Sequence, residues 1–246
     1  MLGIVVALPW ELKSLTRKNV AAGGVELIAE NAVAALSGIG AERAYAAGEL
    51  LIARGATGLL SWGCCGALDD RLEAGTLIVP KMVIAHNGEN YLVDEPWHRA
   101  LEQKLFLRQR VRVDALVETD CILRTPEKKR ALALSSGAAV SDMESAAPAR
   151  LARERGLPFA VMRAVIDSVP TTLPENILRA LDRDGDNRLR DFFSDALLHP
   201  TDWVALMRLG RQFAAARRTM KKVGAQVLDI SNNYLDSVAP PASARS

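Results

Sequence analysis

The sequence predicts an α/β fold, a single-domain three-layer sandwich in which helices cover both faces of a mixed, mostly parallel central sheet. Stretches of strand length alternate with stretches of helical character until about residue 167 of the 246-residue chain, which is typical of a largely parallel sheet. An unbroken apolar run occupies residues 2–8, as expected of a strand that is buried on both faces. Apolar residues make up 49% of the chain and aromatic residues only 5%, a composition that suits close packing of helices on a sheet.

The first part of the chain supplies a strand and helix, a hairpin, and a further helix and strand. Pro9 ends the first strand, and a helix follows it because a proline at a helix start loses no hydrogen bond. Glu30-Asn31 is a plausible hairpin turn, and the hairpin makes the sheet mixed. In order, the predicted elements are a strand at 2–8, a helix from residue 10, strands at 25–29 and 32–36, a glycine loop at 37–40, a helix at 41–54, a strand at 57–62 and a glycine loop at 63–67.

The second part continues the alternation and ends in a helical extension. The predicted elements are a strand at 75–84, a helix at 97–107, a strand at 111–117, a helix at 127–135, a strand at 137–140, a helix at 146–155 and a strand at 159–166. Beyond Asp167 the pattern changes to a loop between Pro170 and Pro174, followed by helix over 192–224 with a break at His199-Pro200. We therefore expect one domain over residues 1–230, of which 170–230 are the helical C-terminal part, and a flexible tail at 231–246.

Charge and cysteine content exclude several classes of protein. The net charge is +2, so the charge balance does not indicate nucleic-acid binding. Cys64, Cys65 and Cys121 form no CxxC motif, which argues against a disulfide framework or a zinc site. The N-terminal apolar run is too short for a signal peptide, and no run approaches the roughly 18 residues of a membrane span. A cytoplasmic location is the default expectation.

Acidic residues stand where predicted strands end. Asp142-Met143-Glu144 lies where a strand passes into a helix, Asp167 ends the next strand, and Glu11 follows the first strand. Ligands bind at this edge of an open α/β sheet. Three carboxylates in one cleft would repel, so at least one pKa should rise, as general acid catalysis near neutral pH requires. For Glu11 the simpler interpretation is a carboxylate that caps a helix.

Other motifs have equally plausible structural interpretations. The glycine loops at 37–40 and 63–67 could bring backbone N–H groups to a ligand, or could simply join strand to helix. Neither is followed by the Gly-Lys-Ser/Thr of a phosphate-binding loop. Met143 could pack in the core or lie against a sugar. The three histidines have no metal-ligand spacing, and the acidic segment 182–186 lacks the glycine and glutamate positions of a calcium loop.

The C-terminal helix is amphipathic and basic. An apolar stripe that includes Leu209 and Phe213 shares this helix with six cationic residues: Arg208, Arg211, Arg217, Arg218, Lys221 and Lys222. One interpretation is a helix docked on the sheet by its apolar side. The other is a surface for peripheral association with an anionic membrane or a lipid-like substrate.

The ordered set of motifs resembles the superfamily of purine nucleoside phosphorylases and methylthioadenosine–adenosylhomocysteine nucleosidases. The set consists of the apolar strand leading to Glu11, Ser37-Gly38-Ile39-Gly40, Gly63-Cys64-Cys65-Gly66-Ala67-Leu68 with Gly75-Thr76-Leu77-Ile78-Val79, Asp142-Met143-Glu144, and Arg163-Ala164-Val165-Ile166-Asp167. The resemblance covers roughly residues 2–170. The segments around 180–185 and 199–218 are similar to the hopanoid-biosynthesis branch, which is associated with removing adenine from adenosylhopane.

The resemblance implies a role for each residue of the candidate site. The catalytic set would be Asp167, which protonates purine N7, Glu11, which activates water, and Glu144, which holds the ribose hydroxyls. The substrate-binding residues would be Met143, Glu144, Cys64, Gly63, Ile122 and Ile39. Cys64 falls near the ribose or phosphate, and Ile122 falls where relatives have an aromatic residue on the purine. Ile166 stands where relatives usually have a serine.

Hydrolysis is expected rather than phosphorolysis. The phosphorylases of this family have an arginine at the position of Ser61 and a Gly-Asp-Pro-x-Arg segment, and both are absent here. A phosphate dianion usually needs such an arginine. The expected function is therefore cleavage of the N-glycosidic bond of a 5′-substituted adenosine, without a cofactor or metal and in a homo-oligomer. Phosphorolysis with phosphate as co-substrate, methylthioadenosine/adenosylhomocysteine hydrolysis and nucleoside binding without turnover are the alternatives.

Overall fold

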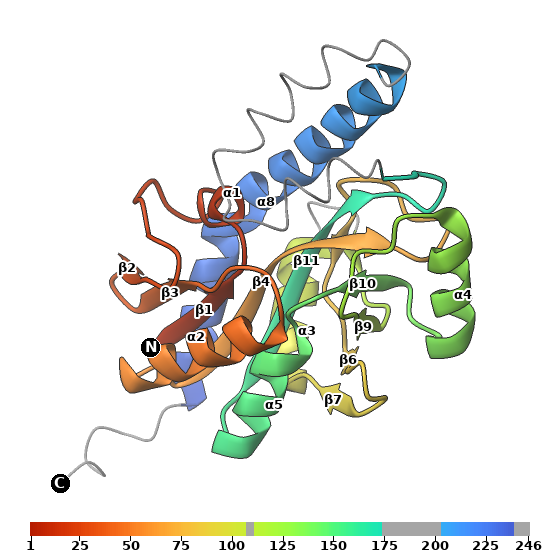
Figure 1. The fold of residues 1–246 in the computed structure, drawn as a ribbon. Helices are drawn as coiled ribbons and strands as arrows, with labels where there is room; N and C mark the ends of the chain where they lie inside the picture. Colours follow the sequence, from red (N-terminus) through yellow and green to blue (C-terminus); the bar gives the residue numbers. More distant parts are fainter. Residues whose placement is uncertain (107–110, 174–202, 239–246) are drawn as a thin grey trace, which may run out of the picture.

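The computed structural model describes residues 1–106, 111–173 and 203–238, and these form a twisted sheet between two layers of helices (Figure 1). The described strands are β1 (Leu2–Val6), β2 (Val25–Ala29), β3 (Ala32–Leu36), β4 (Gly58–Ala67), β5 (Leu77–Ile78), β6 (Met82–Ile84), β7 (Asn90–Leu92), β8 (Val111–Arg112), β9 (Leu116–Glu118), β10 (Val140–Asp142) and β11 (Phe159–Asp167). The described helices are α1 (Pro9–Leu12), α2 (Ala41–Ala53), α3 (Glu95–Phe106), α4 (Pro126–Ser136), α5 (Ala146–Arg155) and α8 (Trp203–Val238).

Strand β4 is the centre of the sheet. It pairs in parallel with β1 along its first half and with β11 along most of its length, and its last residues pair antiparallel with β10. The strand order is β2-β3-β1-β4-β10-β9-β6-β7, and β11 links β4 to β5 and β8. The predicted mixed, mostly parallel sheet is confirmed, and its antiparallel pairs include the β2–β3 hairpin.

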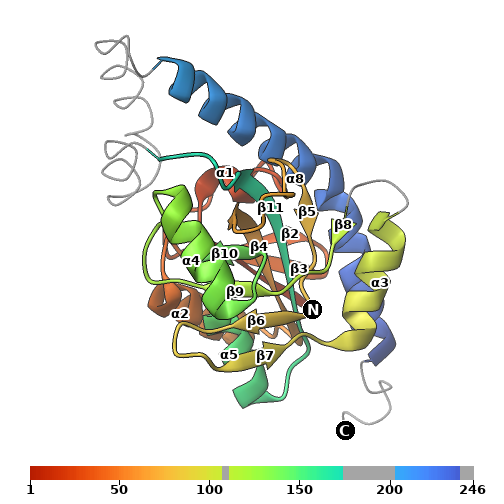
Figure 2. The same ribbon diagram turned by 90° about the vertical axis from the view of Figure 1, so that its right-hand side faces the viewer.

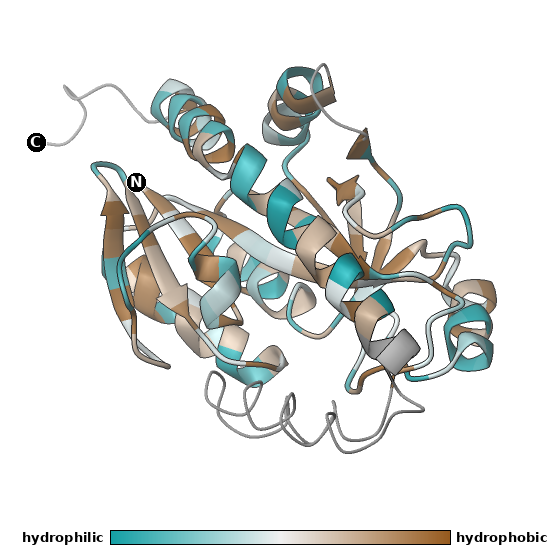
Figure 3. Ribbon diagram, turned by 90° about the horizontal axis from the view of Figure 1, so that it is seen from above, coloured by the Kyte–Doolittle hydropathy of each residue, from teal (hydrophilic) through white to brown (hydrophobic). Residues whose placement is uncertain are grey.

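Successive strand residues point into two different apolar layers. Leu59 packs in a cluster with α2 and α5, and its neighbour Leu60 packs in a cluster with α3 and α8. This follows from the two-residue period of a strand, which sends alternate side chains to opposite faces. Figure 2 shows α3 and α8 on one side of the sheet, and Figure 3 shows hydrophobic residues concentrated along the strands. The predicted three-layer packing is confirmed.

The expected glycine loop at 63–67 is wrong, because strand β4 continues through it to Ala67. Gly63 is paired with Arg163, and Gly66 is paired with Asp167, on strand β11. Glycine normally weakens a strand, but here the ladders to β10 and β11 hold both edges of the segment. Gly63 and Gly66 therefore indicate that other side chains approach strand β4 closely at these two positions. These side chains belong to the candidate site.

Two predicted long strands are each divided in the structure. The expected strand at 75–84 forms β5 and β6, which are separated around Pro80, a residue with no N–H to donate to a ladder. The expected strand at 111–117 forms β8 and β9. In both cases the first piece joins the β5–β8 pair and the second joins the β6–β9 pair, so the chain crosses between two parts of the sheet.

Helix α8 extends farther than predicted. It continues to Val238, so the flexible tail expected from residue 231 is wrong for the residues up to that point. Ser231 is buried and accepts a hydrogen bond from the indole N–H of Trp97 at 3.1 Å. Tyr234 stacks on Trp97 with ring centroids 5.5 Å apart. The predicted break at His199-Pro200, the acidic segment 182–186 and the tail beyond Val238 lie outside the described residues.

No helix within the described ranges is long and apolar enough to cross a membrane.

Candidate active site

A cavity of about 320 Å³ lies at the carboxyl ends of β10 and β11, beside the second half of β4. Seven of the eight predicted site residues line it: Glu11, Ile39, Cys64, Ile122, Met143, Glu144 and Asp167. The eighth, Gly63, lies behind the carboxylate of Glu11. Residues that are far apart in the sequence therefore meet at one point, as expected for the edge of an α/β sheet.

Glu11 is held by backbone groups from two elements. It is 2% exposed. Its carboxylate accepts the N–H of Leu8 at 3.0 Å, which caps α1, and the N–H of Cys64 on β4 at 2.8 Å. Burial raises the pKa of Glu11, and the positive charge of Arg163 opposes that rise. Oε2 of Glu11 caps the start of α1, and Oε1 binds the N–H of Cys64 beside the cavity. The capping role and the position at the cavity are therefore compatible.

Gly63 is needed for that arrangement. A Cβ atom at this position would lie 2.9 Å from Oε1 of Glu11, closer than such contacts normally come. Gly66, three residues later, would place a Cβ 3.2 Å from Oδ1 of Asp167. Gly63 and Gly66 thus make room for two of the candidate catalytic carboxylates.

Glu144 lies between the other glycine loop and β10. The N–H of Gly40 donates to its Oε1 at 3.0 Å, and the adjacent Met143 lines the cavity. Burial, together with the negative charge of Asp142, raises the pKa of Glu144 to about 8. The loop at 37–40 therefore supplies a backbone donor to a site carboxylate, whereas its predicted contact with a ligand stays a prediction.

Asp167 is aimed into the cavity by an irregularity in the ladder. The register between β11 and β4 shifts between Val165 and Asp167, and such bulges re-aim side chains. The Asp167 carboxylate forms a buried ion pair with Lys129, which is 1% exposed. Burial raises the pKa of Asp167, and Lys129 opposes the rise.

The sequence does not identify Lys129 as a site residue. It lies in the run Glu127-Lys128-Lys129-Arg130 on α4, which is indistinguishable in sequence from a solvated helix surface. The tertiary structure buries this one residue, whose ammonium group contacts Asp167, Ser168 and Thr171 at and after the end of β11. A buried lysine is rare unless it is paired, and removing one partner of such a pair costs about 3–5 kcal/mol.

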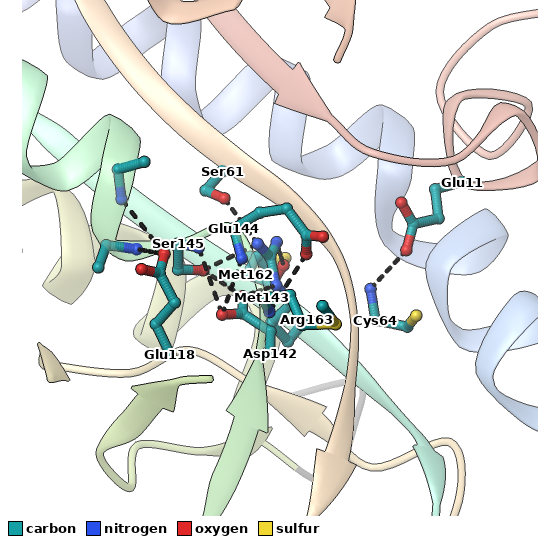
Figure 4. Close-up of polar contacts among 12 residues, drawn as sticks. Glu11, Ser61, Cys64, Glu118, Asp142, Met143, Glu144, Ser145, Met162 and Arg163 are labelled. Carbon is teal, nitrogen blue, oxygen red and sulfur yellow. Dashed lines mark hydrogen bonds and ion pairs between the residues drawn. The ribbon is translucent and has the colours of Figure 1, made fainter. Parts of the chain in front are cut away.

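A second buried ion pair supports the segment that carries Glu144. Arg163 donates to Asp142 at 2.7 Å, to Ser61 at 2.6 Å and to Ser145 at 2.8 Å, as Figure 4 shows. Arg163 and Asp142 are both buried. Asp142 in turn accepts the N–H groups of Glu144 at 3.4 Å and Ser145 at 3.3 Å, which orders the Met143-Glu144 turn.

Glu118 is a further buried carboxylate that sequence reasoning missed. It accepts the N–H groups of Ala146 at 2.8 Å and Ala147 at 3.4 Å, at the start of α5. A negative charge at a helix N-terminus is favourable. Burial raises the pKa of Glu118. Its contacts assign it a structural role in anchoring α5 (Figure 4).

The remainder of the cavity wall is largely apolar. Trp10 and Phe213 meet with ring centroids 4.6 Å apart, and Leu8, Ile122 and Leu209 lie in the same wall. Leu209 and Phe213 belong to α8, so the apolar stripe of that helix closes the cavity as well as packing on the sheet. An apolar wall beside three carboxylates suits a substrate with a polar and an apolar end.

Comparisons with known proteins place these features in a family. The family described as the phosphorylase superfamily matches residues 2–197. No curated protein sequence matches the chain at a significant level. Among solved structures, the chain is similar to the futalosine hydrolase of Helicobacter pylori strain 26695, with 17% identity and a TM-score of 0.68 over 93% of this chain and 97% of that one.

Two nucleosidase structures show the same likeness. A complex of the 5′-methylthioadenosine/S-adenosylhomocysteine nucleosidase of Helicobacter pylori has 16% identity and a TM-score of 0.70, covering 93% of this chain and 97% of that one. The corresponding enzyme of Neisseria meningitidis, bound to methylthio-immucillin-A, has 19% identity and a TM-score of 0.68, covering 92% and 97%. At these identities the likeness shows the shared fold.

Proposed function

The chain belongs to the phosphorylase superfamily, and from this premise we propose that it is a nucleosidase that hydrolyses the N-glycosidic bond of a 5′-substituted adenosine and releases adenine. One observation carries the proposal: Glu11, Glu144 and Asp167 line a single cavity. The nucleosidases and the futalosine hydrolase that share its fold support this reaction class.

The three carboxylates would divide the reaction among them. Cleavage of a glycosidic bond passes through an oxocarbenium-like sugar, so it needs an acid at the leaving group and a nucleophile on the far face. As the bond from C1′ to N9 breaks, its electrons pass to the purine, and Asp167 gives a proton to N7. Water attacks C1′ and loses a proton to Glu11. Glu144, beside Met143, accepts hydrogen bonds from the ribose hydroxyls.

The raised pKa values are consistent with this division. Burial keeps the pKa of Asp167 above its ordinary value, so the protonated form that a general acid needs is more populated. The carboxylate of Glu11 keeps two backbone donors, which fix its orientation toward the cavity. Two carboxyl groups in different environments can then act as acid and base in the same cycle.

Hydrolysis is favoured over phosphorolysis because the cations at and near the cavity, Lys129 and Arg163, are already paired with protein groups. Among the described residues that line the cavity, Lys129 is the single cation, and it is paired with Asp167. Arg163 lies nearby, but it forms a buried ion pair with Asp142 and also donates to Met162, Ser61 and Ser145. A phosphate dianion would find no unengaged cation in this part of the wall, so water is the proposed nucleophile.

The apolar wall formed by Trp10, Leu209 and Phe213 supports an apolar 5′ substituent. Adenosylhopane is the most specific candidate, because the sequence resembles the hopanoid-biosynthesis branch. The segments that carry that resemblance fall partly outside the described residues. A panel of 5′-substituted adenosines, with methylthioadenosine, adenosylhomocysteine and adenosylhopane as members, would rank the substituents by kcat/KM for adenine release.

Replacement of the acid tests the assignment. Asp167→Asn should lower adenine release by about 10²–10⁴-fold, the usual contribution of one general acid. Asp236→Asn, which changes an exposed carboxylate on α8, is the matched control. Adenine release by Asp167→Asn at the wild-type rate, with the control also active, would refute the proposed role.

The nucleophile is tested by phosphate dependence. Glu11→Gln should lose activity in phosphate-free buffer, because the amide cannot accept the proton of water. Turnover that requires phosphate and yields a ribose 1-phosphate product would instead establish phosphorolysis. Binding of adenine nucleosides without any cleavage would favour a binding protein.

The homo-oligomer implied by the resemblance remains a prediction, which sedimentation velocity would check.

A further inference from the structure

We infer that Lys129 is a positioning residue for Asp167, holding the acid in place and stabilising the carboxylate that remains after proton transfer. The inference rests on the proposed function. It concerns a residue that contacts the acid rather than the substrate, and it arises from the ion pair that Lys129 of α4 makes with Asp167 at the end of β11.

The Lys129 ammonium group has all three of its donors engaged. It donates to Oδ2 of Asp167, to the carbonyl oxygen of Ser168 at 3.0 Å and to that of Thr171 at 3.3 Å. Three donors are all that a lysine offers. The same side chain therefore fixes the carboxylate and the turn that follows it, so the carboxylate cannot move independently of its own loop.

The turn is also fastened from its other side. Gln212 of α8 donates to the hydroxyl of Ser168 at 2.9 Å and to that of Thr171 at 3.0 Å. Lys129 and Gln212 thus hold the same short segment from two helices. Asp167 is positioned by these contacts as well as by its own strand.

One carboxylate oxygen is left for a substrate. Lys129 binds Oδ2, whereas Oδ1 is the oxygen that faces Gly66 on β4. Within the described part of the chain, no hydrogen bond ends on Oδ1. This division of the two oxygens is what a general acid requires: one is anchored, and the other is free to carry the proton to N7.

The charge of Lys129 should affect the chemistry as well as the geometry. When Asp167 gives its proton to the base it becomes an anion, and the adjacent ammonium group stabilises that anion. The other titratable groups of the cavity are Cys64 and Cys65 on β4, Cys121, Asp142 on β10, Glu11 on α1 and Glu144 after β10, and Arg163 on β11 is the second buried cation nearby. Arg163 pairs with Asp142, so the cation in contact with Asp167 is Lys129.

The charge of Lys129 determines the direction in which its removal should shift the pH dependence of the reaction. Lys129 lowers the pKa of Asp167 against the effect of burial, so its removal raises that pKa further. The basic limb of the kcat/KM profile, where the acid loses its proton, should then move to higher pH. At the same time the acid becomes weaker, so the maximal rate should fall. A merely structural lysine would lower the rate without moving the limb.

The test uses two leaving groups and three variants. Lys129→Met removes the charge, Lys129→Gln removes the charge but keeps a donor, and Lys128→Met changes the exposed neighbour on the same helix. Each is assayed with a 5′-substituted adenosine, whose base needs protonation, and with p-nitrophenyl riboside, whose leaving group departs as a stable anion. Circular dichroism establishes that each variant is folded.

Lys129→Met should lose about 10²-fold in kcat for adenine release and shift the basic limb upward, while nitrophenol release changes only a few-fold. Lys129→Gln should shift the limb with a smaller loss, and Lys128→Met should match the wild type. Equal losses on both substrates, an unmoved limb, or failure of both Lys129 variants to fold would overturn the inference. A wild-type protein that cleaves neither substrate would instead refute the proposed function.

Discussion

Gly63 and Gly66 of strand β4 show how single residues make room for the site. Their conformation is ordinary extended strand, so turn formation does not explain them. Their explanation is space: Gly63 accommodates Glu11, and Gly66 accommodates Asp167. A motif that suggested backbone donors for a ligand instead admits two side chains to the cavity.

The substitution Gly63→Ala tests this account. The new Cβ would lie 2.9 Å from Oε1 of Glu11, so the carboxylate must move or give up its bond to the N–H of Cys64 on the same strand. Misplacement by about 1 Å can cost on the order of 10²-fold in rate. We expect a loss of that order in kcat, measured as adenine release in phosphate-free buffer.

The far-ultraviolet circular dichroism of Gly63→Ala should remain that of the wild type, because both edges of β4 stay paired. Wild-type kcat in the folded variant would show that Glu11 does not need this space.

Helix α8 combines two properties that the sequence presented as alternatives. Its apolar side is docked, since Ala216, Met220, Val223 and Val227 are buried against the sheet. Its opposite side carries exposed cations, among them Arg211, Arg218 and Lys221. The N-terminal part of α8 also extends beyond the body of the sheet (Figures 1 and 2). Docking therefore leaves the basic surface available.

Association of this surface with anionic membranes remains a prediction. The protein should bind vesicles that contain phosphatidylserine and should be released by salt, because each basic residue near such a surface contributes about 1 kcal/mol. The variant Arg211→Glu/Arg218→Glu should bind much more weakly in a vesicle co-sedimentation assay. Equal binding to neutral and anionic vesicles, or no binding at low salt, would contradict the prediction.

The buried carboxylates affect the stability of the entire fold. Burial raises the pKa of Glu144 to about 8, and it also raises the pKa of Glu11 and of Asp167. A carboxyl group with a raised pKa binds its proton more tightly in the folded state than in the unfolded state. Its stabilising contribution is present below the unfolded pKa, near 4.5, and is lost as the pH rises toward 8. The candidate site therefore costs stability at neutral and alkaline pH.

The substitution Glu144→Gln should recover part of that stability. The amide does not ionise, so the melting temperature of the variant relative to the wild type should increase between pH 5 and pH 9. Each kcal/mol recovered should raise the melting temperature by roughly 2–4 °C. Differential scanning calorimetry at several pH values would measure this difference, and a difference that is constant with pH would contradict it.

The predictions that succeeded rest on local patterns. Apolar runs identified the principal strands, and the helix at 146–155 begins and ends as predicted. Glu144 and Asp167 were identified by their positions at or just after strand ends. They meet because β10 runs antiparallel and β11 parallel to β4, so that both strands end beside Gly66. Glu11 joined them because the first strand pairs in parallel with β4.

The errors have a common cause in pairing and packing. Strand β4 continues through its glycines because β10 and β11 hold its edges, and α8 continues past residue 231 because Trp97 binds Ser231 and stacks on Tyr234. Neither partner is adjacent in sequence, so no local pattern contains this information.

The alternation of strands and helices and the placement of three carboxylates near strand ends were thus predictable from the chain, since strand period and strand-end position are local properties. The tertiary structure alone decided which cations are buried at the site, where Lys129 pairs with Asp167 and Arg163 pairs with Asp142. Lys129 and Arg163 lie 34 residues apart in a chain with 31 lysine and arginine residues, and only burial distinguishes them from cations at the surface. Burial depends on contacts between distant parts of the chain: Lys129 is covered by Asp167, Ser168 and Thr171, and Arg163 lies within strand β11 in the interior of the sheet.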